Sequence, residues 1–132
     1  MKNPNNPCLF CNIIESDLTD ENELAYASYD SYPVSKYHSL IIPKRHVKNY
    51  FDLSNEEIIA CNELINKIKE QIEIKDKTVK GFNVGTNSGK VAGQSILHCH
   101  IHLIPRREGD VDNPQGGVRS VIPLKQHYIR KS

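Results

Sequence analysis

Three histidines at alternate positions of an apolar run are the residues of this sequence best suited to chemistry: His98, His100 and His102. Successive side chains of a β-strand point to opposite faces, so a strand over 96–104 would place the three imidazoles on one face and the intervening apolar residues in the core. A row of imidazoles adds little packing, and its members repel one another once they are protonated. A purely structural role is therefore a poor explanation for all three.

Such a face can serve two kinds of chemistry. Alternating histidines can bind one catalytic metal ion, with a water molecule completing the site. Alternatively, one neutral imidazole can act as a nucleophile, oriented through its second nitrogen, while a neighbouring histidine donates a proton. The triplet by itself leaves both open.

The segment before the triplet favours an anionic ligand. Residues 86–95 are rich in glycine, amide and hydroxyl side chains, among them Asn87, Gln94 and Ser95. Glycine lets a ligand approach the backbone, and exposed backbone N–H groups can hold phosphate oxygens. The segment contains no carboxylate, although hard cations prefer carboxylate ligands. We therefore expect phosphate to bind here.

The four cysteines pose a separate question: they are Cys8, Cys11, Cys61 and Cys99. A chain long enough to build its own core, in a reducing compartment, rarely depends on a disulfide framework. The two-residue spacing of Cys8 and Cys11 offers half of a zinc site, with two buried free thiols as the alternative. Cys61 and Cys99 are interpreted as core residues.

One long helix and four strands are expected to position these residues. Ser54 and Glu57 form a capping-box pattern at a helix start. Apolar residues then recur at spacings of three and four, as an amphipathic helix requires, at Ile58, Cys61, Ile65, Ile68 and Ile72. The expected strands cover 23–29, 38–43, 81–84 and 96–104. This order predicts an α+β fold with a small antiparallel sheet.

Length and composition indicate one domain over 1–132, with a loose arm at 1–7 and an extended tail at 107–132. The chain has 17 basic and 16 acidic residues, a net charge of +1. This balance gives no electrostatic footprint for a duplex nucleic acid or an anionic membrane. No apolar run approaches the roughly 20 residues of a membrane span, and no signal peptide is apparent. We therefore expect a cytoplasmic protein.

The sequence resembles the histidine triad (HIT) superfamily of nucleotide hydrolases and transferases. The resemblance rests on Gly93-Gln94-Ser95 followed by the alternating histidines, on the segment 38–46, and on the CxxC motif at 8–11. Together these segments cover most of residues 8–107. The segment 109–123 is similar to the tail of microbial members described as diadenosine tetraphosphate hydrolases.

The resemblance implies roles for individual residues. His100 would be the nucleophile that attacks the α-phosphorus of a nucleotide and forms a covalent nucleotidyl-histidine, while a backbone carbonyl holds its second nitrogen. His102 would lie near the leaving-group oxygen, and His98 completes the catalytic triad. The implied substrate-binding residues are Asp30 for the ribose, His38 beside it, and Asn87, Gln94 and Ser95 for the phosphates. Lys90, Arg106 and Arg107 are candidates for holding a polyphosphate.

The resemblance also implies a cofactor and a partner. A closed zinc site would consist of Cys8, Cys11, His46 and His98, and it would tie the amino-terminal turn to the catalytic strand. This zinc is structural, so the reaction would need no catalytic metal, and magnesium bound with the substrate is compatible with it. The partner would be a second copy of the chain, whose sheet continues the first.

The resulting prediction is hydrolysis of dinucleoside polyphosphates, or of related nucleoside monophosphate derivatives, with release of a nucleoside monophosphate. A phosphorylase or nucleotidyl transferase and a nucleoside phosphoramidase are alternatives with the same covalent intermediate. Two alternatives belong to other classes: a metal-dependent hydrolase that uses the whole triplet as ligands, and a nucleotide-binding adaptor.

Overall fold

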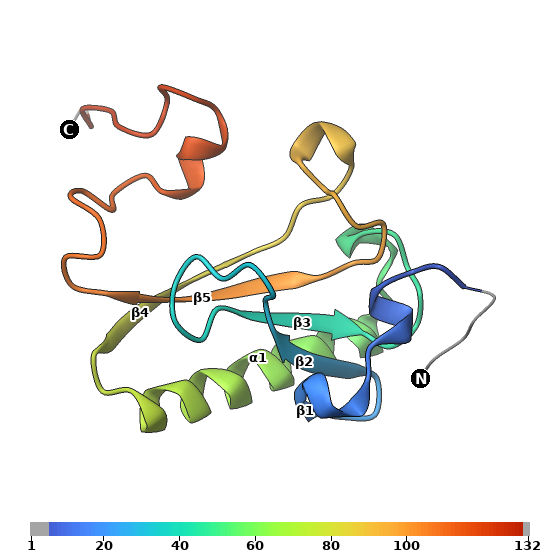
Figure 1. Cartoon of the computed structure of the whole chain (residues 1–132). Coiled ribbons are helices and arrows are strands. Elements are labelled where there is room, and N and C mark those ends of the chain that lie inside the picture. The colour runs from blue at the N-terminus through green and yellow to red at the C-terminus, as the bar shows by residue number, and fades with distance from the viewer. Residues whose placement is uncertain (1–5, 131–132) are drawn as a thin grey trace.

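A five-stranded antiparallel sheet carries one long helix on one face (Figure 1), in a computed structural model that describes residues 6–130. The strands, in the spatial order β1-β2-β3-β5-β4, are β1 (Leu18–Glu21), β2 (Ala25–Tyr29), β3 (Ser39–Pro43), β5 (Ile101–Arg107) and β4 (Val79–Gly85). The helix is α1 (Asn55–Lys75). Short 3-10 helices cover Phe10–Asn12, Glu15–Asp17, Tyr50–Asp52, Lys90–Ala92 and Val118–Val121. The predicted α+β class is confirmed, while residues 1–5 of the expected arm lie outside the described part.

Helix α1 begins at the predicted capping box. The Ser54 hydroxyl accepts from the Glu57 backbone N–H, and Glu57 accepts from the Ser54 N–H at 2.8 Å. The Arg45 guanidinium binds the same carboxylate through two nitrogens, at 2.7 and 3.0 Å, and holds the Glu57 pKa near 2. Of the predicted apolar positions, Cys61, Ile68 and Ile72 are buried, whereas Ile58 and Ile65 are half-buried.

The sheet separates two apolar clusters because its side chains alternate between faces. On the helix side, α1 packs against small and branched residues of three strands: Ala25, Ala27, Ile41, Ile101 and Leu103. On the opposite side, Tyr26, Leu40 and Ile42 pack against Phe10 from the amino-terminal segment. The face opposite α1 is thus the one that the amino-terminal segment reaches.

All four predicted strands are present with bounds shifted by a few residues, and two differences are larger. Strand β1 was not expected from the sequence, and β5 begins at Ile101 rather than at residue 96. Residues 94–100 make other backbone contacts: Gln94 N–H donates to Gly89 O, and Cys99 N–H donates to Val47 O at 2.8 Å. Only His102 of the triplet therefore lies in a strand.

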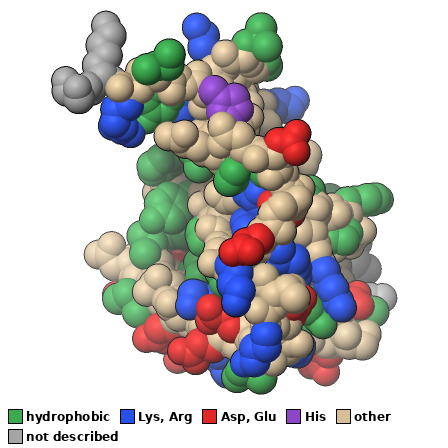
Figure 2. All heavy atoms as spheres, turned by 90° about the vertical axis from the view of Figure 1, so that its left-hand side faces the viewer, with side chains coloured by type: hydrophobic (Ala, Val, Ile, Leu, Met, Phe, Trp, Pro, Cys, Tyr) green, Lys and Arg blue, Asp and Glu red, His purple; other side chains and the backbone are tan. Residues whose placement is uncertain are grey.

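Beyond β5, residues 108–130 run through turns and one short 3-10 helix, on the side of the sheet opposite α1 (Figure 1). Figure 2 shows this tail as a lobe that stands above the body of the molecule, and lysine and arginine interleave with acidic side chains on that face. Asp110 fixes the start of the tail, because its carboxylate binds Arg106 at 2.8 and 2.9 Å. Within residues 6–130, no helix is long and apolar enough to cross a membrane.

Candidate functional site

His100 is held in one defined tautomer. Its Nδ1 lies 2.8 Å from the backbone carbonyl oxygen of His98. A carbonyl only accepts, so Nδ1 carries the proton and Nε2 of the neutral ring keeps its lone pair. The residue is only 8% exposed. An imidazole in this state is prepared to act as a nucleophile, and the backbone carbonyl expected from the resemblance is present.

Two residues that hold His100 were not singled out from the sequence. The Phe10 ring lies 5.0 Å from the His100 ring, centre to centre, and the Phe10 carbonyl accepts from the buried Tyr26 hydroxyl. The Thr86 hydroxyl donates to the His100 carbonyl at 2.7 Å. Phe10 sits inside the CxxC motif, and Thr86 begins the glycine-rich segment, but neither residue type by itself indicates the contact.

His102, His38 and Asp30 form a second group on the same side of the sheet. His38 Nε2 lies 2.9 Å from His102 Nδ1 and 3.4 Å from a carboxylate oxygen of Asp30. The Val34 backbone N–H donates to His38 Nδ1 at 3.1 Å, so the proton of neutral His38 is on Nε2. His38 therefore donates to His102 Nδ1, which leaves the proton of neutral His102 on Nε2.

Both rings of this pair are kept neutral by their surroundings. Burial lowers the pKa of His38, against a weaker opposite effect of Asp30. Burial also lowers the pKa of His102, and the neighbouring rings of His100 and His38 lower it further. A neutral His38 with its proton on Nε2 cannot offer that nitrogen to a metal ion, so a hydrogen-bonded chain explains this group better than a metal site.

A separate cluster has the composition of a metal centre. Its ligand atoms, which all lie within 4.8 Å of one another, belong to Cys8, Cys11, His46 and His98. A tetrahedral ion at the usual zinc–sulfur and zinc–nitrogen distances separates sulfur from nitrogen by roughly 3.6 Å and nitrogen from nitrogen by roughly 3.3 Å. Here Cys8 and Cys11 Sγ lie 3.4 and 3.5 Å from His98 Nδ1, Cys11 Sγ lies 3.2 Å from His46 Nδ1, and the two nitrogens are 3.2 Å apart. These are the four residues predicted from the resemblance, and they are positioned to bind a metal ion.

His98 connects this cluster to the nucleophile. Its ring is fully buried, with Nδ1 toward both cysteines and Nε2 2.8 Å from the Pro43 carbonyl. The carbonyl fixes the proton on Nε2, so the lone pair of Nδ1 faces the thiols, as metal binding requires. Burial lowers the pKa of His98 and raises that of Cys11.

The triplet does not converge on one ion. His98 faces the cysteines, His102 faces His38 and Asp30, and His100 belongs to neither of the two groups of potential ligands found among residues 6–130. The three rings thus have three different environments, although the sequence predicts one row on one face. The structure gives no support to a catalytic metal held by all three.

The phosphate-binding candidates have different surroundings. Asn87 is half-buried and Ser95 is exposed, so both side chains can reach a ligand. Gln94 is buried, and its side chain binds three backbone groups. The N–H groups of residues 89 and 92–94 are also bonded within the chain, although the sequence analysis expects exposed amides here.

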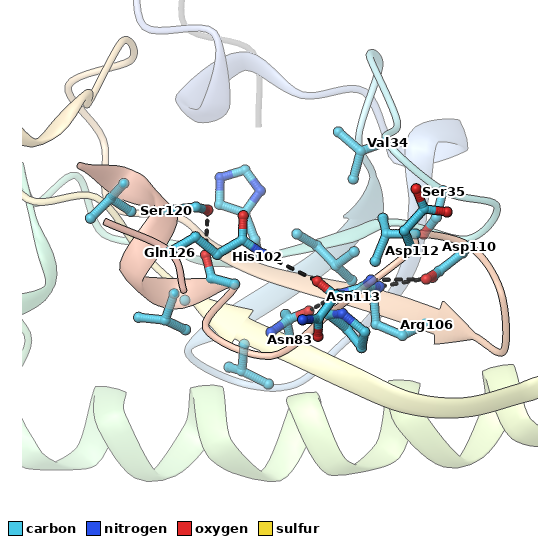
Figure 3. Close-up of a pocket in the computed structure, with 18 of the residues that line it drawn as sticks. Val34, Ser35, Asn83, His102, Arg106, Asp110, Asp112, Asn113, Ser120 and Gln126 are labelled. Atoms are coloured by element: carbon cyan, nitrogen blue, oxygen red, sulfur yellow. Dashed lines mark hydrogen bonds and ion pairs between the residues drawn. The ribbon is translucent and has the colours of Figure 1, made fainter. Parts of the chain in front are cut away.

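A cavity of about 800 Å³ lies between β4, β5 and the tail, with His102 in its wall (Figure 3). Asn83, Asn113 and Gln126 contribute amide groups, and several valines contribute apolar surface. Its arginine, Arg106, is paired with Asp110, as the dashed lines in Figure 3 mark.

The other two predicted polyphosphate contacts lie elsewhere. Arg107 binds Asp76 at 3.0 Å, and the exposed Lys90 is not in the cavity wall.

Comparison with known proteins identifies the family of this chain. The HIT domain model matches residues 12–109. An uncharacterised HIT-like protein of Methanocaldococcus jannaschii is 37% identical over 108 residues, which cover 78% of this chain and 81% of that protein. The adenosine 5'-monophosphoramidase of Saccharomyces cerevisiae is 32% identical over 105 residues, 76% of this chain and 63% of the relative.

A solved structure of similar architecture is a zinc-bound histidine triad family protein from Mycobacterium smegmatis. It has a TM-score of 0.71 and 30% identity, and the match covers 79% of this chain and 78% of that one. The family model spans all five strands and the whole of α1, and it includes all three histidines of the triplet. The chain belongs to the HIT domain family.

Proposed function

We propose that the protein hydrolyses nucleoside monophosphate derivatives at the α-phosphorus through a covalent intermediate on His100. The observation that carries the proposal is the His98 carbonyl on His100 Nδ1, which leaves Nε2 as the one basic nitrogen of a shielded ring. A nucleophile that is already oriented reacts faster, because less entropy is lost when it reaches the phosphorus.

The proposed reaction has two displacements. In the first, His100 Nε2 bonds to the α-phosphorus and the bond to the leaving group breaks; the Nε2–H of His102 donates a hydrogen bond to the leaving atom, which takes its proton from solvent water. In the second, water attacks the phosphorus, the phosphorus–nitrogen bond breaks, the electron pair returns to His100 Nε2, and the proton of the water goes to solvent. Val34, through His38, supports this role because it fixes the His102 tautomer.

A substrate panel tests this function. We expect AMP release from diadenosine tri- or tetraphosphate, an adenosine phosphoramidate or a nucleotide sugar, at a rate independent of added inorganic phosphate. Formation of ADP when phosphate is added would identify a phosphorylase instead. Tight AMP binding without turnover of any substrate would identify a nucleotide-binding adaptor.

Charge in the cavity beside His102 favours a phosphoramidase over a polyphosphate hydrolase. The wall contains one arginine and two aspartates, Arg106, Asp110 and Asp112, and the arginine is already paired. A tetraphosphate would meet uncompensated repulsion here, whereas an amine leaving group would not. The yeast relative is named for phosphoramidate hydrolysis. Dinucleoside polyphosphate hydrolysis, which the resemblance implies, stays a prediction.

We expect kcat/KM for the adenosine phosphoramidate to exceed that for diadenosine tetraphosphate by at least about tenfold, or ~1.4 kcal/mol. The variant Asp110→Asn removes the carboxylate that pairs with Arg106, so the positive charge of Arg106 becomes available to a phosphate. We therefore expect this variant to have a higher kcat/KM for the tetraphosphate and a smaller preference for the phosphoramidate. Steady-state kinetics on both substrates measure it. A ratio that favours the tetraphosphate in the wild-type protein would contradict the charge argument.

Asp30 is proposed to bind the ribose hydroxyls. One of its oxygens accepts from the Tyr32 N–H at 2.8 Å, and the other lies near His38 and His102. We expect Asp30→Ala to weaken AMP binding about tenfold, as loss of hydrogen bonds to a charged group does, with a smaller change in kcat. Calorimetric titration and steady-state kinetics separate the two. Unchanged AMP affinity with a lower kcat would refute the ribose role and assign Asp30 to the histidine chain.

We propose that the ion in the Cys8–Cys11–His46–His98 cluster is zinc. Two thiolates and two imidazoles whose ligand atoms all lie within 4.8 Å of one another suit zinc, and four protein ligands leave no position for substrate. The ion supplies no step of the reaction and closes the amino-terminal turn over the nucleophile. Its expected effect on stability is treated in the Discussion.

We propose that the partner is a second copy of the chain, joined at β4. Strand β4 pairs only with β5, so its other edge is open among the described residues. An apolar cavity of about 320 Å³ adjoins that edge, lined by half-buried Ile58 and Ile65 and exposed Val84 among others.

Light scattering is expected to give twice the chain mass. Ile65→Glu, which puts a charge into the joint surface, is expected to give the monomer mass. A wild-type monomer at high concentration would contradict the proposal.

A further inference from the structure

The side chain of Gln94 uses all of its hydrogen-bonding groups on the backbone. Its Oε1 accepts from the Gly89 N–H at 2.9 Å, and its Nε2 donates to the carbonyls of Ile96 (3.0 Å) and Lys48. The residue is 4% exposed. A direct contact with phosphate, the role that the resemblance implies, would break at least one of these bonds and leave a buried group unpaired.

These bonds close the loop that carries the phosphate candidates. Gly89 and Gln94 bind each other twice, because the Gln94 N–H also donates to the Gly89 carbonyl at 3.1 Å. Gly89 has a φ of +94°, where only glycine is unstrained, so the loop has one specific shape that these bonds maintain. Asn87 precedes the closed segment and Ser95 follows it.

The third bond connects this loop to the metal cluster. Lys48 lies two residues after His46, and the carbonyl of the intervening Val47 accepts from Cys99, between His98 and His100. The segment 46–48 thus contacts the cluster, the histidine segment and, through Gln94, the loop over residues 87–95.

We infer that Gln94 is a positioning residue: it holds Asn87 and Ser95 at the phosphate site by fastening their loop to segment 46–48, and does not itself bind phosphate. The inference rests on the proposed function, because it concerns the phosphate of that substrate. If Gln94 has this role, replacing it should weaken the binding of the phosphate group but not the binding of the nucleoside.

The test compares Gln94→Ala with Asn22→Ala. Asn22 is a matched control, since its side chain also binds three backbone groups, Leu24 N–H, Ala25 N–H and the Ala60 carbonyl, in a region outside the site. Both variants are expected to lower the melting temperature. Only Gln94→Ala is expected to weaken AMP binding, by about tenfold or more, while adenosine binding changes by less than about twofold.

Amide hydrogen exchange of Gly89 in the wild-type protein provides a second measurement that needs no variant. We expect the Gly89 N–H to stay protected when AMP binds, because Gln94 remains on it. Loss of that protection with AMP would mean that Gln94 turns toward the phosphate, which overturns the inference.

Two other results would also overturn it: equal losses of AMP and adenosine affinity in Gln94→Ala, or the same AMP-specific loss in Asn22→Ala. A wild-type protein that does not bind AMP would contradict the proposed function, and the inference about Gln94 would fail with it. AMP binding in the wild type, with any of the overturning results above, contradicts the positioning role alone.

Discussion

Replacing His100 by alanine is expected to lower the rate of AMP release by at least about a thousandfold, because removal of a covalent nucleophile leaves only substrate binding and electrostatic stabilisation. The same variant is expected to bind AMP within about threefold of wild type, since alanine leaves the proposed contacts of Asp30 and Ser95 with the nucleotide in place. Steady-state kinetics and calorimetric titration measure the two effects.

The comparison of kinetics and binding separates catalysis from folding. His100→Ala retains the His98 ring and therefore the metal cluster, so metal content should match the wild type. Activity that persists in a metal-loaded His100→Ala protein would contradict the covalent mechanism. Loss of activity on chelation, with full activity of this variant, would instead favour a metal-dependent hydrolase.

Replacing Cys11 by alanine is expected to abolish zinc binding and to lower the melting temperature by at least about 10 °C. A structural zinc site contributes folding free energy directly, and a loss of about 3 kcal/mol corresponds to a shift of this size in a domain of this length. The proposed zinc would hold the turn that places Phe10 against the His100 ring, so kcat should fall as well. Metal analysis and thermal unfolding of protein purified without added zinc check the prediction.

Cys61 provides the matched control for this change. It is buried in α1 and lies outside the metal cluster, and burial raises the pKa of its thiol to about 11, so it stays a neutral core residue. Cys61→Ala is expected to cost about 1 to 2 kcal/mol through lost packing and to keep one zinc per chain. Wild-type protein without metal, or equal metal content in the two variants, would refute the zinc site.

Local patterns made the helix and the metal cluster predictable. The hydrogen bonds of the Ser54–Glu57 capping box join residues within one helical turn, so a stretch of four residues is enough to predict where α1 begins. The spacing of Cys8 and Cys11, combined with the family resemblance, predicts His46 and His98 as the other two ligands. The structure brings all four together, as expected.

The arrangement around the histidines was less predictable because it depends on long-range backbone contacts. The alternation of residues 96–104 predicts a strand, but the bond from Cys99 to Val47 and those of Gln94 take residues 94–100 out of the sheet. The group that orients His38 is the backbone N–H of Val34, and a backbone contact of this kind cannot be predicted from the type of the residue. Arg106 was a polyphosphate candidate by charge alone, and only the fold shows that Asp110 pairs with it.

The stereochemical course at the α-phosphorus tests the central claim most directly. Two in-line displacements, first by His100 and then by water, each invert the phosphorus centre, so their sum is retention. A substrate whose α-phosphorus is made chiral with sulfur and oxygen isotopes reports the outcome in the released nucleotide. Our account predicts retention, whereas inversion would mean that water attacks in a single step and that His100 forms no bond to phosphorus.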